Sequence, residues 1–287
     1  MVRMNQAPAT RRIVIVAFPG VQPLDVVGPA EVFGTAERLV HDSYEIEVVA
    51  ETADPISPLP AGTRTRGRRP PRGVTMLTAY LLYPGFTALD ITGPHDVLNS
   101  VPGSESIFVA EEAGPVRNES DTLSLVADKS IAEVTSPDIL VVPGGFGTRV
   151  LLDHEPLLSW IRQVNETTTW TTSVCTGSLL LAAAGLLDEA PATTHWCSRG
   201  RLGEMGVDVR AERVVEHGKI ITAAGVSSGI DMALTLVQRI HGDEVASAVQ
   251  LGIEYNPEPP LDSGSPEKAD PEITKLVAAV FADLEPA

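Results

Sequence analysis

From Val74 onward, hydrophobic positions fall into alternating strand-like and helix-like groups. DILVVPGG is a continuous apolar run typical of a buried parallel strand, and HEPLLSWIRQVNE after it has helical spacing. The pattern then predicts a strand at TWTTSV, a helix over GSLLLAAAGLL, two strands in ERVVEHGKIITAAG, and helices at SSGIDMALTLVQRI and DEVASAVQLGIE. This alternation predicts an α/β sandwich with a mostly parallel sheet, in which functional sites gather at the carboxyl ends of strands.

One segment of the chain occurs twice. FPGVQPLDVVGPAEVF at 18–33 recurs as YPGFTALDITGPHDVL at 83–98, so that Pro19 corresponds to Pro84, 65 positions later. Each copy follows an apolar strand and leads into a helix, which we expect to begin at the Gly-Pro pair, because proline is well tolerated at the first helical position. After the first copy the strand and helix pattern ends in a polar stretch rich in proline, glycine and arginine. We therefore expect an incomplete repeat over residues 1–60 and a complete domain over 74–287.

Residues 61–73, AGTRTRGRRPPRG, have the composition of a solvated linker. The five arginines between positions 64 and 72 also raise the alternative of a nucleic-acid-binding arm, but no aromatic residue lies among them for base stacking. The whole chain carries a formal net charge of −17, which repels phosphate backbones and anionic lipids. We expect neither nucleic acid nor membrane as a partner. With no apolar run near the roughly 20 residues of a membrane span and no signal-peptide pattern, we expect a cytoplasmic protein.

Cys175 follows the strand TWTTSV and precedes the helix that begins near Gly177. A thiol there lies beside the positive end of a helix dipole, which lowers its pKa and favours the reactive thiolate. The only other cysteine is Cys197, and the two form no CxxC pair, so we expect neither a metal site nor a disulfide framework. Free cysteine is also a common small core residue, so position alone leaves both roles open.

Two further segments reach the same edge of the predicted sheet. PGGFG at 143–147 ends a buried strand, and the backbone N–H groups of Gly144 and Gly145 could form a nest for an anion. The segment lacks the third glycine of GxGxxG, so we expect no nicotinamide or flavin cofactor. Asp90 follows the strand of the second copy, where it could act as an acid or base, cap the following helix, or do both.

Four segments together resemble the DJ-1/PfpI superfamily and, within it, the isocyanide (isonitrile) hydratases: YPGFTALDITGPHDVL, DILVVPGGFGT, SVCTGSLLLAAAGLLDEAPATTHW and QLGIEYNPEPPLDSGSP. The resemblance covers residues 74–285. It implies a flavodoxin-like three-layer sandwich similar to class I glutamine amidotransferases, and a homodimer. The implied activity is a hydro-lyase (carbon–oxygen lyase) reaction without cofactor or metal, in which an isocyanide is hydrated to an N-substituted formamide.

The same resemblance implies roles for individual residues. Cys175 would attack the isocyanide carbon to give a thioimidate, Asp90 would donate and accept protons, and Thr176 would orient Asp90 or hold the water. We expect His195 to have a structural or pocket role rather than to act as a base. The expected substrate-binding residues are Gly144, Gly145, Ile91, Phe146 and Trp196.

Two alternatives remain open. Glyoxalase-like and deglycase-like members of the superfamily often carry histidine after the cysteine and glutamate at the strand-one acid, whereas this chain has Thr176 and Asp90. Ligand-sensing domains of AraC-type regulators share the fold, and residues 1–60 resemble a truncated copy of their opening. Such regulators need a helix-turn-helix after the sensor, and only PEITKLVAAVFADL follows here. The sequence therefore favours the hydratase.

The first copy carries Asp25 at the position of Asp90 but no matching cysteine, so we expect no second active site. It could be a fused remnant, the product of a non-native translational start, or an extra layer packed on the main domain.

Overall fold

The computed structural model describes residues 10–51, 55–56 and 76–283 of the chain. The expected linker at 61–73 lies outside the described residues.

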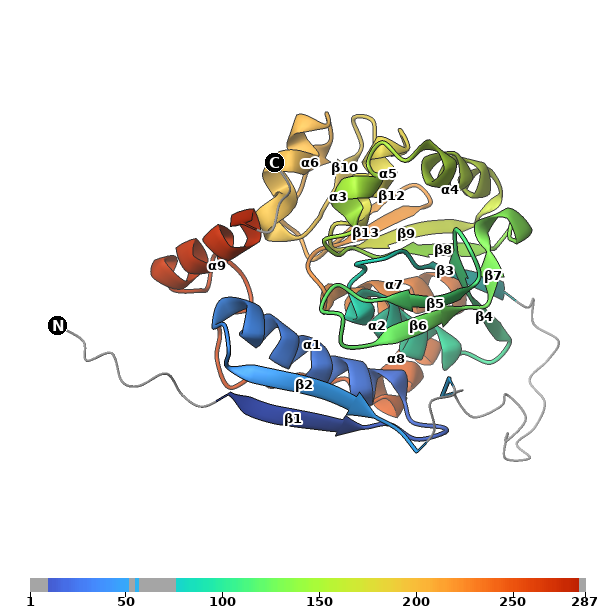
Figure 1. Cartoon of the computed structure of the whole chain (residues 1–287). Helices are drawn as coiled ribbons and strands as arrows, with labels where there is room; N and C mark the ends of the chain where they lie inside the picture. The colour runs from blue at the N-terminus through green and yellow to red at the C-terminus, as the bar shows by residue number, and fades with distance from the viewer. Residues whose placement is uncertain (1–9, 52–54, 57–75, 284–287) are drawn as a thin grey trace.

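A seven-stranded sheet forms the middle layer, in the order β12-β13-β9-β8-β3-β4-β7 (Figure 1). Every neighbouring pair is parallel except β12 and β13, which form an antiparallel hairpin. The prediction of a mostly parallel α/β sandwich is therefore confirmed. The strands are β3 (Met76–Leu81), β4 (Ser104–Ala110), β7 (Lys129–Ser130), β8 (Ile139–Val142), β9 (Trp170–Val174), β12 (Val214–His217) and β13 (Ile220–Ala223).

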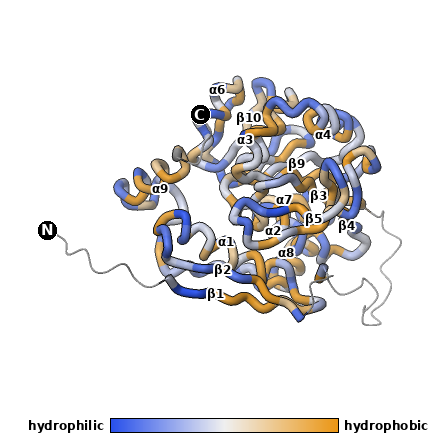
Figure 2. Tube along the Cα trace, viewed as in Figure 1, coloured by the Kyte–Doolittle hydropathy of each residue, from blue (hydrophilic) through white to orange (hydrophobic). Residues whose placement is uncertain are grey.

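Hydrophobic residues are concentrated along the inner strands, and all four residues of β8 are buried (Figure 2). Two short pairs lie outside this sheet: the antiparallel pair β5 (Gly114–Arg117) and β6 (Ser124–Ala127), and the parallel pair β10 (Pro191–Ala192) and β11 (Asp208–Val209).

Helices cover both faces of the sheet (Figure 1). One layer consists of α2 (Ala88–Asn99), α7 (Ser228–His241) and α8 (Asp243–Gly252), in which α7 packs against both others. The opposite layer contains α3 (Thr148–Leu151), α4 (Glu155–Thr167), α5 (Gly177–Ala183) and α6 (Arg199–Glu204), and α9 (Pro271–Asp283) projects at one end of the molecule. The remaining helical turns are η1 (Ile131–Glu133) and η2 (Trp196–Ser198). None of the described helices has the length and apolar character needed to cross a bilayer.

The first copy forms a separate β-α-β unit of β1 (Arg11–Val16), α1 (Pro23–Leu39) and β2 (Tyr44–Val49). Among the described residues its strands pair only with each other, in parallel, and α1 packs against α2 of the main domain (Figure 1). Residues Val27 and Ala30 of α1 belong to the same buried hydrophobic cluster as the main domain.

The expected start of the two repeated helices is wrong. They begin at Pro23 and Ala88, so that Pro29 and Pro94 lie inside them. An internal proline forfeits one backbone hydrogen bond of the helix. Packing offsets this loss in α2, because the ring of Pro94 lies against Gly229 of α7, where an added Cβ would be 3.1 Å from it.

Candidate active site

Cys175 lies at the carboxyl end of β9, immediately before α5, and its side chain is 6% exposed. Its backbone has φ of +56°, a left-handed conformation that costs a non-glycine residue about 1–3 kcal/mol. The surrounding chain holds this conformation: the Cys175 N–H donates to the carbonyls of Ala223 and Ala224, and the Thr194 hydroxyl donates to the Cys175 carbonyl. This sharp turn places the cysteine between a strand and a helix, where the sequence predicted it.

Gly144 joins Asp90 to the cysteine turn. Its N–H donates to Oδ2 of Asp90 at 2.8 Å. On its other side, an added Cβ would lie 2.5 Å from the Thr176 nitrogen and 2.8 Å from the Cys175 Cβ, so only glycine fits there. The structure therefore brings Asp90, Cys175 and Thr176 together around one glycine.

Asp90 is fully buried in the first turn of α2. Burial raises the pKa of its carboxyl well above the ordinary value, and the charges of Glu119 and Glu31 raise it further, against the opposing hydrogen bond from Gly144. Its Oδ1 has no hydrogen-bond partner within the described residues. The site thus holds a carboxyl whose protonated form is favoured by burial and whose Oδ1 is available for a reaction.

The thiol of Cys175 does not follow the sequence expectation of a lowered pKa. Burial raises its pKa well above the ordinary value, and the negative charges of Asp90 and Glu119 raise it further. The backbone N–H groups of Val226 and Thr176 act in the opposite direction through hydrogen bonds to the sulfur. In this enclosed position desolvation outweighs the dipole of α5, which has only seven residues.

The backbone N–H groups expected to form an anion nest at Gly144 and Gly145 are bonded to side chains of the protein itself. The Gly144 N–H is used by Asp90, and the Gly145 N–H donates to the Thr176 hydroxyl oxygen at 3.0 Å. The next N–H, of Phe146, donates to Glu119. These donors hold the protein's own acceptors in place and are not directed at a ligand.

Thr176 and Tyr83 fix the 143–147 loop from two sides. The Thr176 hydroxyl exchanges hydrogen bonds with Gly145 and accepts one from the Thr148 hydroxyl at 3.3 Å. The buried Tyr83 hydroxyl lies 2.6 Å from the Pro143 carbonyl and 2.8 Å from that of Gly144. Sequence reasoning missed Tyr83, although the repeat held a signal: the first copy has Phe18 at this position, without the hydroxyl.

A cleft of about 490 Å³ lies beside the cysteine turn. One wall is the loop 224–227, which includes Val226, the residue whose N–H bonds the Cys175 sulfur. Trp196 and Leu89 supply apolar surface. Among the other expected pocket residues, Ile91 is fully buried in the hydrophobic core, and Phe146 packs against Phe281 of α9 with ring centroids 5.7 Å apart.

His195 also lines the cleft and lies parallel to the Phe281 ring at 4.9 Å. Burial lowers its pKa to about 4, with the charges of Arg149 and Arg199 lowering it further, so the ring is neutral at pH 7. Its Nδ1 accepts a hydrogen bond from the Cys197 N–H, which places the ring proton on Nε2. This arrangement is that of a packed pocket wall.

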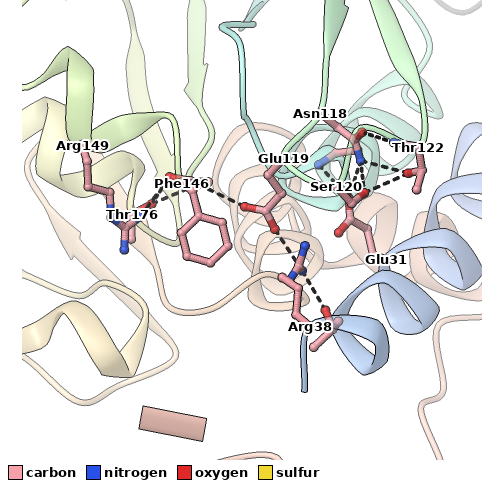
Figure 3. Close-up of polar contacts among 12 residues, drawn as sticks. Glu31, Arg38, Asn118, Glu119, Ser120, Thr122, Phe146, Arg149 and Thr176 are labelled. Carbon is pink, nitrogen blue, oxygen red and sulfur yellow. Dashed lines mark hydrogen bonds and ion pairs between the residues drawn. The ribbon is translucent and has the colours of Figure 1, made fainter. Parts of the chain in front are cut away.

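Charged residues connect the site to the first copy (Figure 3). Glu119 accepts from Arg38 of α1 at 3.2 Å and from the Phe146 N–H at 3.2 Å. Glu31 of α1 accepts from Asn118 at 3.3 Å. Arg149, on the other side of the Phe146 ring system, donates to the Gly145 carbonyl at 3.0 Å. The charged surroundings of Asp90 therefore include Glu31 of the first copy directly, and Arg38 of the first copy through its contact with Glu119.

Neither a metal site nor a disulfide is formed by the described residues. No three His, Cys, Asp or Glu side chains among them are grouped to hold a metal ion, and Cys175 and Cys197 are not bonded to each other.

Comparisons with known proteins agree with this geometry. Residues 78–239 match the model of the DJ-1/PfpI family. The chain is 43% identical over 190 residues to the isonitrile hydratase of Pseudomonas putida, covering 66% of this chain and 83% of that protein. It is 28% identical over 177 residues to the HTH-type transcriptional regulator CdhR of Pseudomonas aeruginosa, covering 59% of this chain and 52% of the regulator.

Among solved structures, a ThiJ/PfpI family protein from Pseudomonas syringae superposes with a TM-score of 0.71 at 31% identity, covering 79% of this chain and 95% of that one. The sheet, the strained cysteine at its edge and these similarities lead to one conclusion: the chain belongs to the DJ-1/PfpI family.

Proposed function

We propose that the protein hydrates an isocyanide, R–N≡C, to the formamide R–NH–CHO, with Cys175 as nucleophile and Asp90 as proton donor and acceptor. The observation that carries this proposal is the placement of Asp90 and Cys175 on two sides of Gly144, in a chain 43% identical to an isonitrile hydratase. An isocyanide carbon must gain both a nucleophile and a proton, and these two groups supply both.

In the first half-reaction Asp90 is protonated and Cys175 is a thiolate. The sulfur forms a bond to the terminal carbon while Asp90 gives its proton to that carbon, leaving the thioimidate R–N=CH–S–Cys and an Asp90 carboxylate. Protonation of Asp90 removes the carboxylate charge that is second only to burial in raising the Cys175 pKa. The acid form of Asp90 therefore favours the thiolate next to it.

In the second half-reaction the Asp90 carboxylate takes a proton from water, whose oxygen bonds to the thioimidate carbon, and passes that proton to the nitrogen. The C–S bond then breaks as the new hydroxyl becomes the formyl oxygen and returns its proton to Asp90. This step releases the formamide and restores the thiolate and the protonated acid.

The remaining expected site residues support these steps. Thr176 holds Gly145, and through this loop it keeps Gly144 against Asp90. Trp196 and Leu89 offer apolar contact for the R group in the cleft. We assign His195 no proton transfer, because burial lowers its pKa to about 4 and its Nδ1 is bonded to the backbone.

The test is incubation of the purified protein with an alkyl isocyanide, with the formyl proton of the product followed by NMR. We expect turnover by the native chain and a loss of about a thousandfold or more in Cys175→Ala, since covalent catalysis is then impossible. Cys197→Ala is the matched control and should retain activity. Turnover that survives Cys175→Ala rules out the covalent mechanism.

A ligand-sensing role is the second candidate, favoured by the 28% identity to a transcriptional regulator. A sensor should bind isocyanides or other small molecules without converting them. Absence of formamide with several isocyanides, together with a change in tryptophan fluorescence on binding that is lost in Trp196→Phe, would support this role instead.

A further inference from the structure

The first copy meets the second through two matched hydrogen bonds. Oε1 of Glu31, on α1, accepts from the Ala88 N–H at the start of α2, at 3.1 Å. Oδ2 of Asp96, on α2, accepts from the Leu24 N–H at the start of α1, also at 3.1 Å. Glu31 and Asp96 are equivalent positions of the repeat, 65 residues apart. Each helix thus places the same acidic position against the N-terminus of the other.

The one-residue difference between the two bonds has a chemical reason. Ala88 corresponds to Pro23, which has no N–H, so Asp96 bonds to the next residue, Leu24. Contacts in which position i of one unit meets j of the other, and j meets i, define an isologous interface between identical subunits. Here the same pattern occurs within one chain, between α1 and α2.

Helix α1 also reaches the cleft beside Cys175. Glu31, Val32 and Thr35 form part of its lining, together with His195 and the loop 224–227. Val32 is 66% exposed, so its side chain is not used in packing. The first copy, for which the sequence left three interpretations open, therefore forms part of the lining of the cleft beside the cysteine turn.

We propose that the β1–α1–β2 unit takes the place of a second subunit on α2, so that the chain is a monomer, and that Val32 and Thr35 of α1 determine substrate selectivity. Helix α1 covers this face of α2 through a reciprocal contact of the kind that two identical subunits make, so the face is closed to a second chain. The selectivity part rests on the proposed hydration, whereas the monomer part does not.

Sedimentation equilibrium of the full chain tests the first part. We expect the mass of one chain, 30.4 kDa, and a mass of two chains would overturn the proposal. Val27 is 3% exposed and lies on the α1 face between Leu24 and Glu31, so Val27→Glu should detach α1 and let two α2 faces associate. The matched control is Val40→Glu, at the residue that follows α1, where the side chain is 58% exposed.

Hydrogen exchange of α1 makes the Val27→Glu result decisive. The proposal expects α1 to lose protection while a discrete two-chain species forms. Full protection of α1 in this variant, or loss of protection without any gain in mass, contradicts the proposal.

Selectivity is tested with Val32→Phe against Val40→Phe. A larger side chain on the α1 wall should raise KM about tenfold for a bulky isocyanide such as cyclohexyl isocyanide and leave methyl isocyanide nearly unchanged. An unchanged ratio of the two KM values overturns the role of α1 in selectivity. If the native chain converts no isocyanide, the proposed function fails, and the mass measurements still decide whether the first copy replaces a subunit.

Discussion

The two copies of the repeat carry an aspartate at the same position, yet only one of these aspartates lies in a site. Asp90 is fully buried, whereas Asp25 is exposed at the start of α1. The strand before Asp90 has β8 as a neighbour, and β9 follows it, whereas β1 pairs only with β2. Gly144 and Cys175 follow β8 and β9, so only the second copy receives them. The difference teaches that the chemistry of this motif depends on the strands beside it.

The residue that opens each copy makes the same point. Tyr83 is buried and its hydroxyl bonds to the carbonyls of Pro143 and Gly144. Phe18 at the equivalent position is 56% exposed and has no loop to support. The copy with the hydroxyl is therefore the one whose neighbouring loop offers carbonyls to accept its hydrogen bond.

The largest expected effect is on the rate of formamide production, when the two equivalent aspartates are replaced one at a time. Asp90→Asn keeps an acceptor for the Gly144 N–H but cannot transfer a proton, so formamide production should fall about 10²–10⁴-fold. Asp25→Asn should leave the rate unchanged because no cysteine turn faces it. Equal losses in both variants would break the comparison between the copies.

A smaller effect is expected on stability, with a defined pH dependence. Burial raises the pKa of Asp90 above the ordinary 3.8, so its contribution to stability is present below that value and is lost as pH rises through the folded pKa. In denaturant titrations at pH 8, the free energy of unfolding of Asp90→Asn should therefore exceed that of the native chain by about 1–3 kcal/mol. This difference should shrink toward pH 4.

Asp25→Asn, in exposed surroundings, is the control and should follow the native curve at each pH. A gain for Asp90→Asn that is independent of pH would contradict the assignment of a carboxyl whose ionisation destabilises the fold.

The smallest effect concerns two equivalent glycines inside the repeated helices. An added Cβ at Gly28 meets nothing within 4 Å, so Gly28→Ala should stabilise the chain by about 0.5–1 kcal/mol through helix propensity. At Gly93 the Cβ would be 3.0 Å from Ile230 of α7.

Gly93→Ala should therefore destabilise the chain by about 1 kcal/mol, despite the same gain in propensity. Thermal unfolding measures both variants. A stabilising Gly93→Ala would mean that α7 moves away at little cost.

Much of the fold followed from local patterns. A continuous apolar run predicted β8, the strand-like segment TWTTSV predicted β9, and helical spacing predicted α4 and α7. The cysteine turn was placed between β9 and α5, as the structure has it. These features depend on residues close together in the chain, whose periodicity sets which face is buried. The helix start predicted at the Gly-Pro pair of the second copy was wrong because it depends on a contact far along the chain. Packing of Pro94 against α7 outweighs the local preference of proline for the first position of a helix.

The ionisation and hydrogen bonding of the candidate site were decided by the tertiary structure alone. A strand end beside a helix suggested an ionised thiol, but burial of Cys175, followed by the negative charges of Asp90 and Glu119, raises the pKa of the thiol. The contact of α1 with α2 likewise joins residues such as Leu24 and Asp96, far apart in the chain. Local sequence patterns are enough to show which groups reach the sheet edge, whereas desolvation and charge at that edge depend on what surrounds each group in three dimensions.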